Sequence, residues 1–258
     1  MYEKKNKSVF VAEMGSSKRN DWEHWVLLSS DHHWDSKKCD REKIEKHLKI
    51  AKDRNADVLM FGDFFDCMGG KYDPRRSKGE IRQELMVPNY FDALVEQAAE
   101  FLAPYKDNIK LITKGNHEMS VLKNQEIDLI ERLGTTINAL HGGQIQIGGY
   151  AGYVVFRFFN NLEERYGCRR KVLSFTHGYG GGGPVTKGTI QSARKAVYLP
   201  EADLVLSGHI HESWILEMMR EKLSNTNLTP PKPTGAWWLR FFWDRPNDTV
   251  DFEIIRAK

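Results

Sequence analysis

Seven side chains in this sequence could bind metal ions, and each closely follows a short apolar run. They are Asp31, His33, Asp63, Asn116, His177, His209 and His211. Three of them offer carboxylate or amide oxygens and four offer imidazole nitrogens, which is more than one ion with an open position can use. Such a set suits two divalent ions about 3.5–4 Å apart, the separation typical of hydrolytic sites with two metals. The sequence therefore predicts a dinuclear centre.

The types of ligand also limit the choice of metal. A site rich in imidazole and oxygen donors, with no thiolate, favours Mn²⁺, Fe²⁺, Zn²⁺, Co²⁺ or Ni²⁺ over Mg²⁺ or Ca²⁺. We expect two divalent metal ions per chain, with Mn²⁺ as the first choice.

The apolar runs that precede these residues are expected to be strands. They cover residues 25–28, 58–61, 109–112, 172–175 and 204–206. In open α/β sheets, ligands gather in the crevice outside the carboxyl ends of the strands, so five such ends indicate one shared site. In an extended chain, residues i and i+2 point the same way. Asp31 and His33 are therefore expected to reach one ion, and so are His209 and His211.

Between these strands the sequence predicts helices. Asp40 is expected to cap a first helix, residues 89–102 form a second, and residues 121–133 form a third that Gly134 stops. The alternation of strands and helices ends near residue 135. Further strands are expected at 144–147, 153–159, 214–219, 236–243 and 250–255. A helix-rich first half and a strand-rich second half suit a sandwich with one sheet from each half. We interpret the aromatic run 237–243 as part of a sheet that is buried on both faces.

Five short motifs, taken in order, resemble those of the calcineurin-like metallophosphoesterases. They are Asp-x-His at 31–33, Gly-Asp-x-x-Asp at 62–66, Gly-Asn-His-Glu at 115–118, His177, and Gly-His-x-His at 208–211. The resemblance spans most of the chain. It implies an α/β (α+β) fold in which a two-sheet β-sandwich is flanked by helices, with a dinuclear site at the carboxyl ends of strands. It also implies hydrolysis of phosphoesters.

The resemblance further implies a role for each residue. Asp31, His33, Asp63 and His211 correspond to the ligands of a first metal, and Asp63, Asn116, His177 and His209 to those of a second. His117 corresponds to the acid that protonates the leaving oxygen, and Asp66 to the carboxylate that orients His117. The chemistry agrees, because a histidine titrates in the range that this proton transfer requires. We interpret the other histidines, His24, His32, His47 and His141, as structural.

Two loops are candidates for contact with substrate. Residues 67–79 begin at the metal site and carry Arg75, Arg76 and Lys78, although such a loop can equally be a solvated surface segment. Residues 178–187 follow His177 and include Gly180, Gly181 and Lys187, and a glycine run lets backbone amides approach a phosphate closely. The second loop could equally be a flexible lid or a tight connection.

Two positions at which this sequence differs from particular branches of the family bear on the substrate. Cys67 stands where the protein phosphatases of the family have arginine, and His117 stands where the lipid-precursor pyrophosphohydrolases have arginine. We therefore expect a phosphodiesterase that acts on nucleic acid or nucleotide substrates, such as a nuclease. The alternatives are a phosphomonoesterase acting on proteins or small molecules, or an inactive scaffold with the same fold.

Length and composition fit one enzyme domain. The 258 residues are expected to form a single domain, 1–258. A net charge of +3 is too small to argue for nucleic acid by itself. The three cysteines are expected to be reduced thiols. The sequence has no apolar leader and no run long enough to span a membrane. Together these features predict a cytoplasmic protein without a membrane partner.

Overall fold

The chain is described by a computed structural model that covers most of its length. The described residues are 1–16, 22–67, 79–180, 188–199, 201–211, 215–216, 237–244 and 249–256, the last two ranges by their backbone alone. The chain divides into two compact units, Met1–Trp214 and Ile215–Lys258. The expectation of a single domain over 1–258 stays a prediction.

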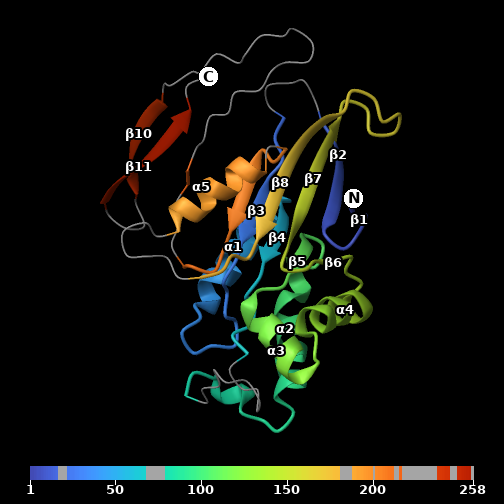
Figure 1. Ribbon diagram of the computed structural model, residues 1–258, viewed down its shortest axis with the longest axis vertical. Coiled ribbons are helices and arrows are strands. Elements are labelled where there is room, and N and C mark those ends of the chain that lie inside the picture. The colour runs from blue at the N-terminus through green and yellow to red at the C-terminus, as the bar shows by residue number, and fades with distance from the viewer. Residues whose placement is uncertain are drawn as a thin grey trace. The chain divides into compact units, whose positions relative to one another are not determined.

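The first unit contains two β-sheets (Figure 1). The smaller sheet is parallel, with the order β3 (Val26–Ser29), β4 (Asp57–Phe61), β5 (Ile109–Thr113) and β6 (Gln146–Ile147). The larger sheet is mixed, with the order β1 (Tyr2–Lys4), β2 (Val9–Gly15), β7 (Ala151–Phe159), β8 (Arg169–Thr176) and β9 (Leu204–Ser207). Of its neighbouring pairs, β2–β7 and β8–β9 are parallel, and β1–β2 and β7–β8 are antiparallel.

Strand β4 shows how the sandwich is held together. All five of its residues are buried, as expected for a strand that is covered on both faces. Leu59 and Phe61 pack with Phe10, Phe175 and other side chains of the larger sheet. The alternate residues Val58 and Met60 join a second core, formed with the helices. The predicted two-sheet sandwich flanked by helices is therefore confirmed.

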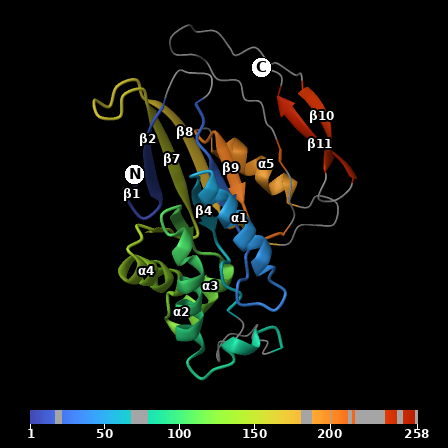
Figure 2. The same cartoon turned by 180° about the vertical axis from the view of Figure 1, so that it is seen from behind.

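Helices cover the outer face of the smaller sheet. They are α1 (Arg41–Asp53), α2 (Tyr90–Leu102), α3 (Asn116–Gln125) and α4 (Leu129–His141), with short 3₁₀ helices η1 (Gln83–Leu85) and η2 (Ala103–Tyr105). Asp40 caps α1 as predicted, by accepting a hydrogen bond from the Lys43 amide at 2.9 Å. The second predicted helix is present as α2. Figure 2 shows α1 lying over β4.

The predicted third helix, 121–133, is wrong. The structure has two helices instead, separated where Glu126 takes a left-handed conformation (φ +59°) and Asp128 caps α4. Gly134 lies inside α4 rather than at its end. A Cβ at this position would stand 2.0 Å from Cδ1 of Ile147, so a larger residue would force the Ile147 side chain to move where α4 passes close to β6.

The prediction of one sheet from each half of the chain is also wrong. Strands β1 and β2 come from the first fifteen residues, yet they belong to the larger sheet with β7, β8 and β9. The strand-rich half also contains a helix that was not predicted, α5 (Thr189–Tyr198), which packs beside β9. The predicted strand at 214–219 lies outside the described residues except at 215–216, which are not in a strand.

The second unit contains one β-hairpin. Strand β10 (Trp237–Asp244) pairs in antiparallel fashion with β11 (Thr249–Arg256), and Phe241 lies opposite Phe252. The strands predicted at 236–243 and 250–255 are thus present to within a residue or two. Whether the aromatic run is buried on both faces concerns side chains outside the described part of the chain.

Among the described residues, no helix combines the length and the apolar character needed to cross a membrane.

Candidate metal centre

The predicted ligands lie just beyond the carboxyl ends of strands, as expected for this arrangement of sheets. Asp31 and His33 follow β3, Asp63 follows β4, and Asn116 and His117 follow β5. From the larger sheet, His177 follows β8, and His209 and His211 follow β9. Backbone hydrogen bonds join the first two loops, from Asp31 N to Gly62 O (3.1 Å) and from His33 N to Asp63 O (3.0 Å).

The backbone at these residues is not extended, so the predicted reason for the convergence is wrong. Five of the ligands have positive φ angles: Asp31 (56°), His33 (46°), Asp63 (48°), His209 (78°) and His211 (53°). Each lies in the left-handed region, which Asp, Asn and His enter more readily than most residues and which still costs free energy. Tight left-handed turns, rather than alternation along an extended strand, therefore point the side chains inward.

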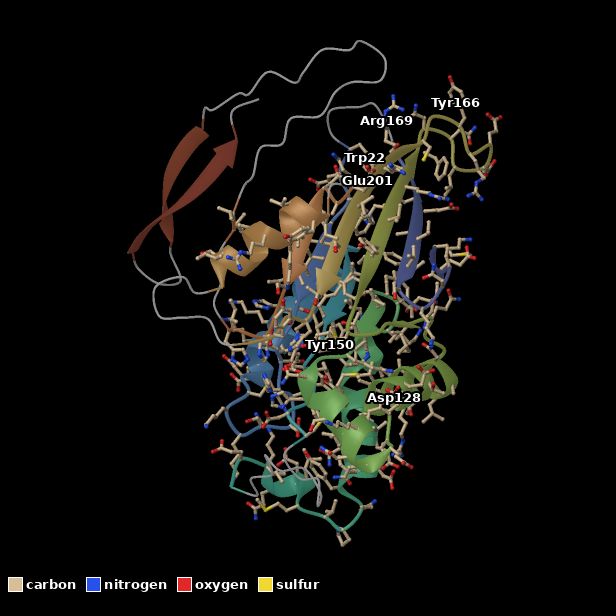
Figure 3. The ribbon with its side chains drawn as sticks, in the orientation of Figure 1. Trp22, Asp128, Tyr150, Tyr166, Arg169 and Glu201 are labelled. Atoms are coloured by element: carbon tan, nitrogen blue, oxygen red, sulfur yellow. The ribbon has the colours of Figure 1, made fainter. Side chains whose placement is uncertain are left out.

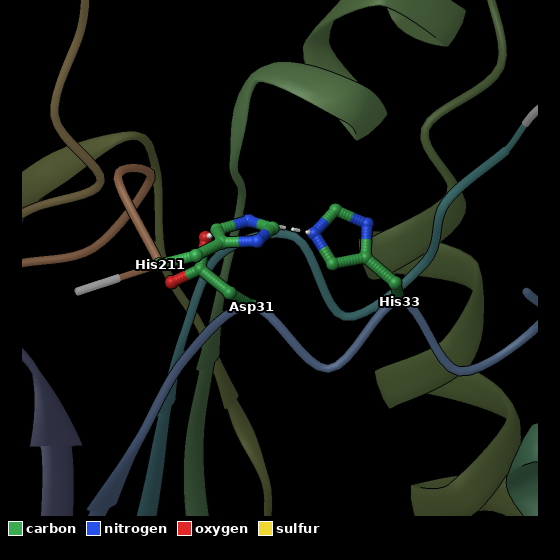
Figure 4. Close-up of side chains that lie close together, drawn as sticks. All are labelled: Asp31, His33 and His211. Atoms are coloured by element: carbon green, nitrogen blue, oxygen red, sulfur yellow. Dashed lines mark hydrogen bonds and ion pairs between the residues drawn. The ribbon is translucent and has the colours of Figure 1, made fainter. Parts of the chain in front are cut away.

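Asp31, His33 and His211 form a first cluster (Figure 4). The His211 Nε2 atom lies 3.5 Å from Asp31 Oδ1 and 3.2 Å from His33 Nε2. Asp31 is held in place by the His209 amide at 2.9 Å and by the Ser30 hydroxyl at 2.5 Å. One carboxylate oxygen and two imidazole nitrogens therefore lie within reach of a single cation.

A second cluster contains Asp63, His177 and His209, with Asn116 beside it. The His177 Nε2 atom lies 2.9 Å from Asp63 Oδ2 and 3.0 Å from Asn116 Oδ1. The ring of Tyr150, labelled in Figure 3, stands edge-on to His177 with 5.7 Å between ring centres. Tyr166 and Arg169 lie at the far end of the sheet from Tyr150 in that view, away from the cluster.

The donor chemistry of the second cluster fits a cation. His177 donates through Nδ1 to the Phe61 carbonyl oxygen at 3.2 Å, so in the neutral ring its Nε2 carries a lone pair. That lone pair and the oxygens of Asp63 and Asn116 converge, and only a positive charge among them makes the arrangement favourable. Burial alone would lower the pKa of His177, but the hydrogen bond and charge of Asp63 outweigh burial and raise this pKa.

Asp63 lies between the two clusters. Its carboxylate belongs to the group with His177 and His209 and also to a group with His33 and His117. The side chain is almost completely buried, and its Oδ1 atom accepts a hydrogen bond from the His117 amide at 2.9 Å. The His117 Nε2 atom is 3.8 Å from Asp63 Oδ2.

Asp66 contacts two histidines, in different ways. Its carboxylate oxygen Oδ1 is 3.0 Å from His33 Nδ1 and 3.4 Å from His117 Nδ1. The His117 Nδ1 atom donates to the Asp66 backbone carbonyl at 2.6 Å. The group that orients His117 most closely is therefore this carbonyl oxygen, whereas the carboxylate mainly orients His33. Burial would lower the pKa of His33, but Asp66 and the charges of Asp63 and Asp31 together raise it.

Two buried carboxylates outside the predicted set of ligands hold the Asp63–Cys67 loop. Glu118 accepts hydrogen bonds from the amides of Asp63 (3.2 Å), Phe65 (2.9 Å) and Gly115 (2.8 Å). Burial and the nearby charge of Asp63 raise the pKa of Glu118 to about 7. The fourth position of Gly-Asn-His-Glu, on the first turn of a helix, is the signal that could have identified it.

Asp35 is the second supporting carboxylate. It accepts hydrogen bonds from the amides of Asp66 (2.5 Å) and Cys67 (3.0 Å) and from the Tyr90 hydroxyl (2.6 Å). Burial raises its pKa, although these hydrogen bonds oppose the rise. Asp35 follows the Asp-x-His motif by two residues, but its partner Tyr90 is distant in the sequence and gives no local signal.

The candidate substrate loops are almost entirely outside the described residues. Arg75, Arg76, Lys78, Gly181 and Lys187 all belong to undescribed segments. Gly180 is described, and it is exposed with φ +77°. Contact between these residues and a substrate stays a prediction.

Comparison with known proteins identifies the family. The family model of the calcineurin-like phosphoesterases matches residues 24–213, well over half of the chain. The chain therefore belongs to the calcineurin-like phosphoesterase family and is a metal-dependent phosphoesterase. Neither the curated proteins nor the solved structures gave a match.

Proposed function

We propose that this enzyme hydrolyses phosphodiester bonds in nucleic acids or nucleotides with two divalent metal ions, Mn²⁺ being the expected metal. Asp63 carries the proposal, because a buried carboxylate between two clusters of donors suits a group shared by two cations. Asp31, His33 and His211 would complete the ligands of one ion. Asn116, His177 and His209 would complete those of the other.

Divalent ions bound there would polarise the phosphoryl oxygens and supply hydroxide near neutral pH. The protein's own contribution is to place the donors before the ions arrive. His177 is fixed by the Phe61 carbonyl, Asp31 by the His209 amide, and the Asp63 loop by Glu118. Ligands held in this way need little rearrangement, which favours metal affinity and a fixed geometry.

We assign proton donation to His117. Its Nδ1 atom is engaged by the Asp66 carbonyl, so a proton on Nε2 is directed toward the cluster of donors. A leaving alkoxide needs such a proton, and general acid catalysis by histidine typically contributes about 10²–10⁴ in rate. His117 adjoins Asn116 at the start of α3, which places its ring beside the clusters.

The preference for diesters rests on Cys67. The thiol is completely buried, and it stands at the position where the protein phosphatases of the family have arginine. A buried, neutral thiol offers no cation for the additional charge of a monoester. The three cysteines are all free, which is compatible with the reducing, cytoplasmic location that we propose.

Turnover of simple substrates tests the proposal. With Mn²⁺ added, we expect the protein to hydrolyse bis(p-nitrophenyl) phosphate faster than p-nitrophenyl phosphate. A faster monoester reaction would instead identify a phosphomonoesterase. Failure to hydrolyse either ester in metal-replete protein would identify a scaffold. A panel of single-stranded DNA, RNA, dinucleotides and cyclic nucleotides would then define the substrate.

A further inference from the structure

A cavity of about 800 Å³ extends from the first cluster into the space between β3 and α1. Asp31, His33, His117 and His211 line one end of it. The volume lies within the range of about 300–1,000 Å³ that is usual for pockets that hold small molecules. The cavity is therefore large enough for an organic group attached to a phosphate at the clusters.

The position of His117 indicates which part of the substrate enters the cavity. His117 and Asp66 both line it, and His117 is the residue to which we assign protonation of the leaving oxygen. The leaving oxygen must lie within hydrogen-bonding reach of His117 Nε2. The group attached to that oxygen therefore extends into this cavity.

The far end of the cavity is partly apolar. Leu27 from β3 and Ile44 and Leu48 from α1 line it, and all three belong to the core between the smaller sheet and its helices. Leu48 is fully buried and the other two are partly exposed. Such a wall suits the flat, weakly polar face of a nucleobase better than a second charged group.

A positive charge lies at the rim of this apolar wall. Lys43 and His47 are four residues apart on α1, so their side chains lie on the same face of the helix, and both line the cavity. The carboxylate of Asp40 is engaged by the Lys43 amide, and Glu80 pairs with Lys38 at 3.1 Å. Within the described part of the chain, the Lys43 ammonium group has no ionic or hydrogen-bonding partner of its own.

We propose that this cavity binds the leaving group of the substrate, and that this group is a nucleotide whose own phosphate is recognised by Lys43. The base would lie against Leu27 and Ile44, and the additional phosphate would lie near Lys43 and His47. This inference rests on the proposed phosphodiesterase function. It makes the substrate an oligonucleotide cleaved so that the released fragment carries a further phosphate beyond the broken bond.

Matched dinucleotides test the inference. The substrates are dTpdT, the same compound with a 5′-terminal phosphate, and the same compound with a 3′-terminal phosphate. Analysis of the products shows which nucleoside leaves with a free hydroxyl at the broken bond. We expect a phosphate on that nucleoside to lower KM about fivefold, the effect of an exposed ion pair worth about 1 kcal/mol. A phosphate on the other nucleoside should change KM less.

Variants of α1 connect this preference to Lys43. Lys43→Ala should abolish the fivefold preference, Lys43→Glu should reverse it, and Lys43→Arg should retain it. In each variant the KM of unphosphorylated dTpdT serves as the internal reference, so the preference is measured as a ratio of two KM values and does not depend on the overall rate of the variant. Lys46→Ala is the matched control, since Lys46 is an exposed lysine of the same helix that does not line the cavity.

The outcomes separate the two proposals. If the enzyme hydrolyses the nitrophenyl diester but shows no preference among the dinucleotides, or a preference unchanged by Lys43→Glu, then the assignment of this cavity is wrong while the phosphodiesterase function stands. If the nitrophenyl diester is not hydrolysed at all, the proposed function fails and this inference fails with it.

Discussion

The carboxylate of Asp66 is closer to His33 than to His117, with Oδ1 at 3.0 Å from one Nδ1 atom and 3.4 Å from the other. His33 presents its other ring nitrogen to His211, in the first cluster. A carboxylate on the far nitrogen of a metal-binding imidazole fixes the ring and increases its basicity. Asp66 therefore supports the first cluster, and it touches His117 mainly through its backbone.

Replacing Asp66 by Asn should weaken metal binding more than proton transfer. Loss of an outer partner of a ligand typically lowers metal affinity by about 10–100-fold. We expect activity to require correspondingly more Mn²⁺ and to recover in excess Mn²⁺. Activity measured against Mn²⁺ concentration checks this, with Glu80→Gln as a control that alters another carboxylate of the same cavity. A loss of kcat that excess metal does not restore would assign Asp66 to the chemical step.

Replacing His117 by Ala should slow the reaction while both metals stay bound. Without the acid, kcat for an alkyl leaving group should fall by about 10²–10⁴. The loss should be much smaller for a nitrophenolate leaving group, which hardly needs protonation. Rates for the two kinds of diester, together with metal analysis of the variant, check the assignment. Equal losses for both leaving groups, or a missing metal ion, would contradict it.

Tyr90→Phe should destabilise the protein. The change removes the hydroxyl that donates to the buried Asp35 carboxylate at 2.6 Å. The carboxylate keeps its two amide donors, so the variant loses one hydrogen bond to a buried carboxyl group, which costs about 1–3 kcal/mol, and the midpoint of urea unfolding should fall accordingly. Tyr166→Phe is the control, because Tyr166 is largely exposed. An unchanged midpoint would show that another group satisfies Asp35.

The raised pKa of Glu118 predicts a pH dependence of stability in metal-free protein. A carboxyl whose pKa is about 7 when folded, and near 4.5 when unfolded, binds a proton more tightly in the folded state. Its stabilising contribution is present below about pH 4.5 and is lost as the pH rises through about 7. Unfolding measured from pH 5 to 8 should show this decline, and Glu118→Gln should reduce it. A decline of the same size in Glu118→Gln would assign it to other groups.

The sequence predicted which strand ends bring the candidate ligands together better than it predicted the local backbone geometry. Each apolar run before Asp31, Asp63, Asn116 and His177 is a strand, and its carboxyl end points to the site. The left-handed backbone at Asp31 and His33 was not predictable from a pattern of apolar and polar residues. Such conformations are imposed by contacts between loops, here the hydrogen bonds to Gly62 and Asp63.

Long-range packing accounts for the other differences. Gly134 resembles a helix stop in isolation, but its role depends on Ile147, which comes close only in the folded chain. The contact between Asp35 and Tyr90 likewise joins distant segments. Strands β1 and β2 belong to the larger sheet because β2 pairs with β7. The pairing runs from Val9 opposite Tyr153 to Gly15 opposite Phe159. The local sequence of a strand does not specify which distant strand it pairs with.

The number of metal ions per chain tests the central proposal most directly, because Asp63 is expected to be shared between two ions. Elemental analysis of active, metal-replete protein should find two ions per chain. Asp63→Asn should weaken both, whereas Asp31→Asn, which alters one cluster, should release mainly one. Finding one ion or none in active wild-type protein, or the loss of the same single ion in both variants, would contradict the dinuclear centre.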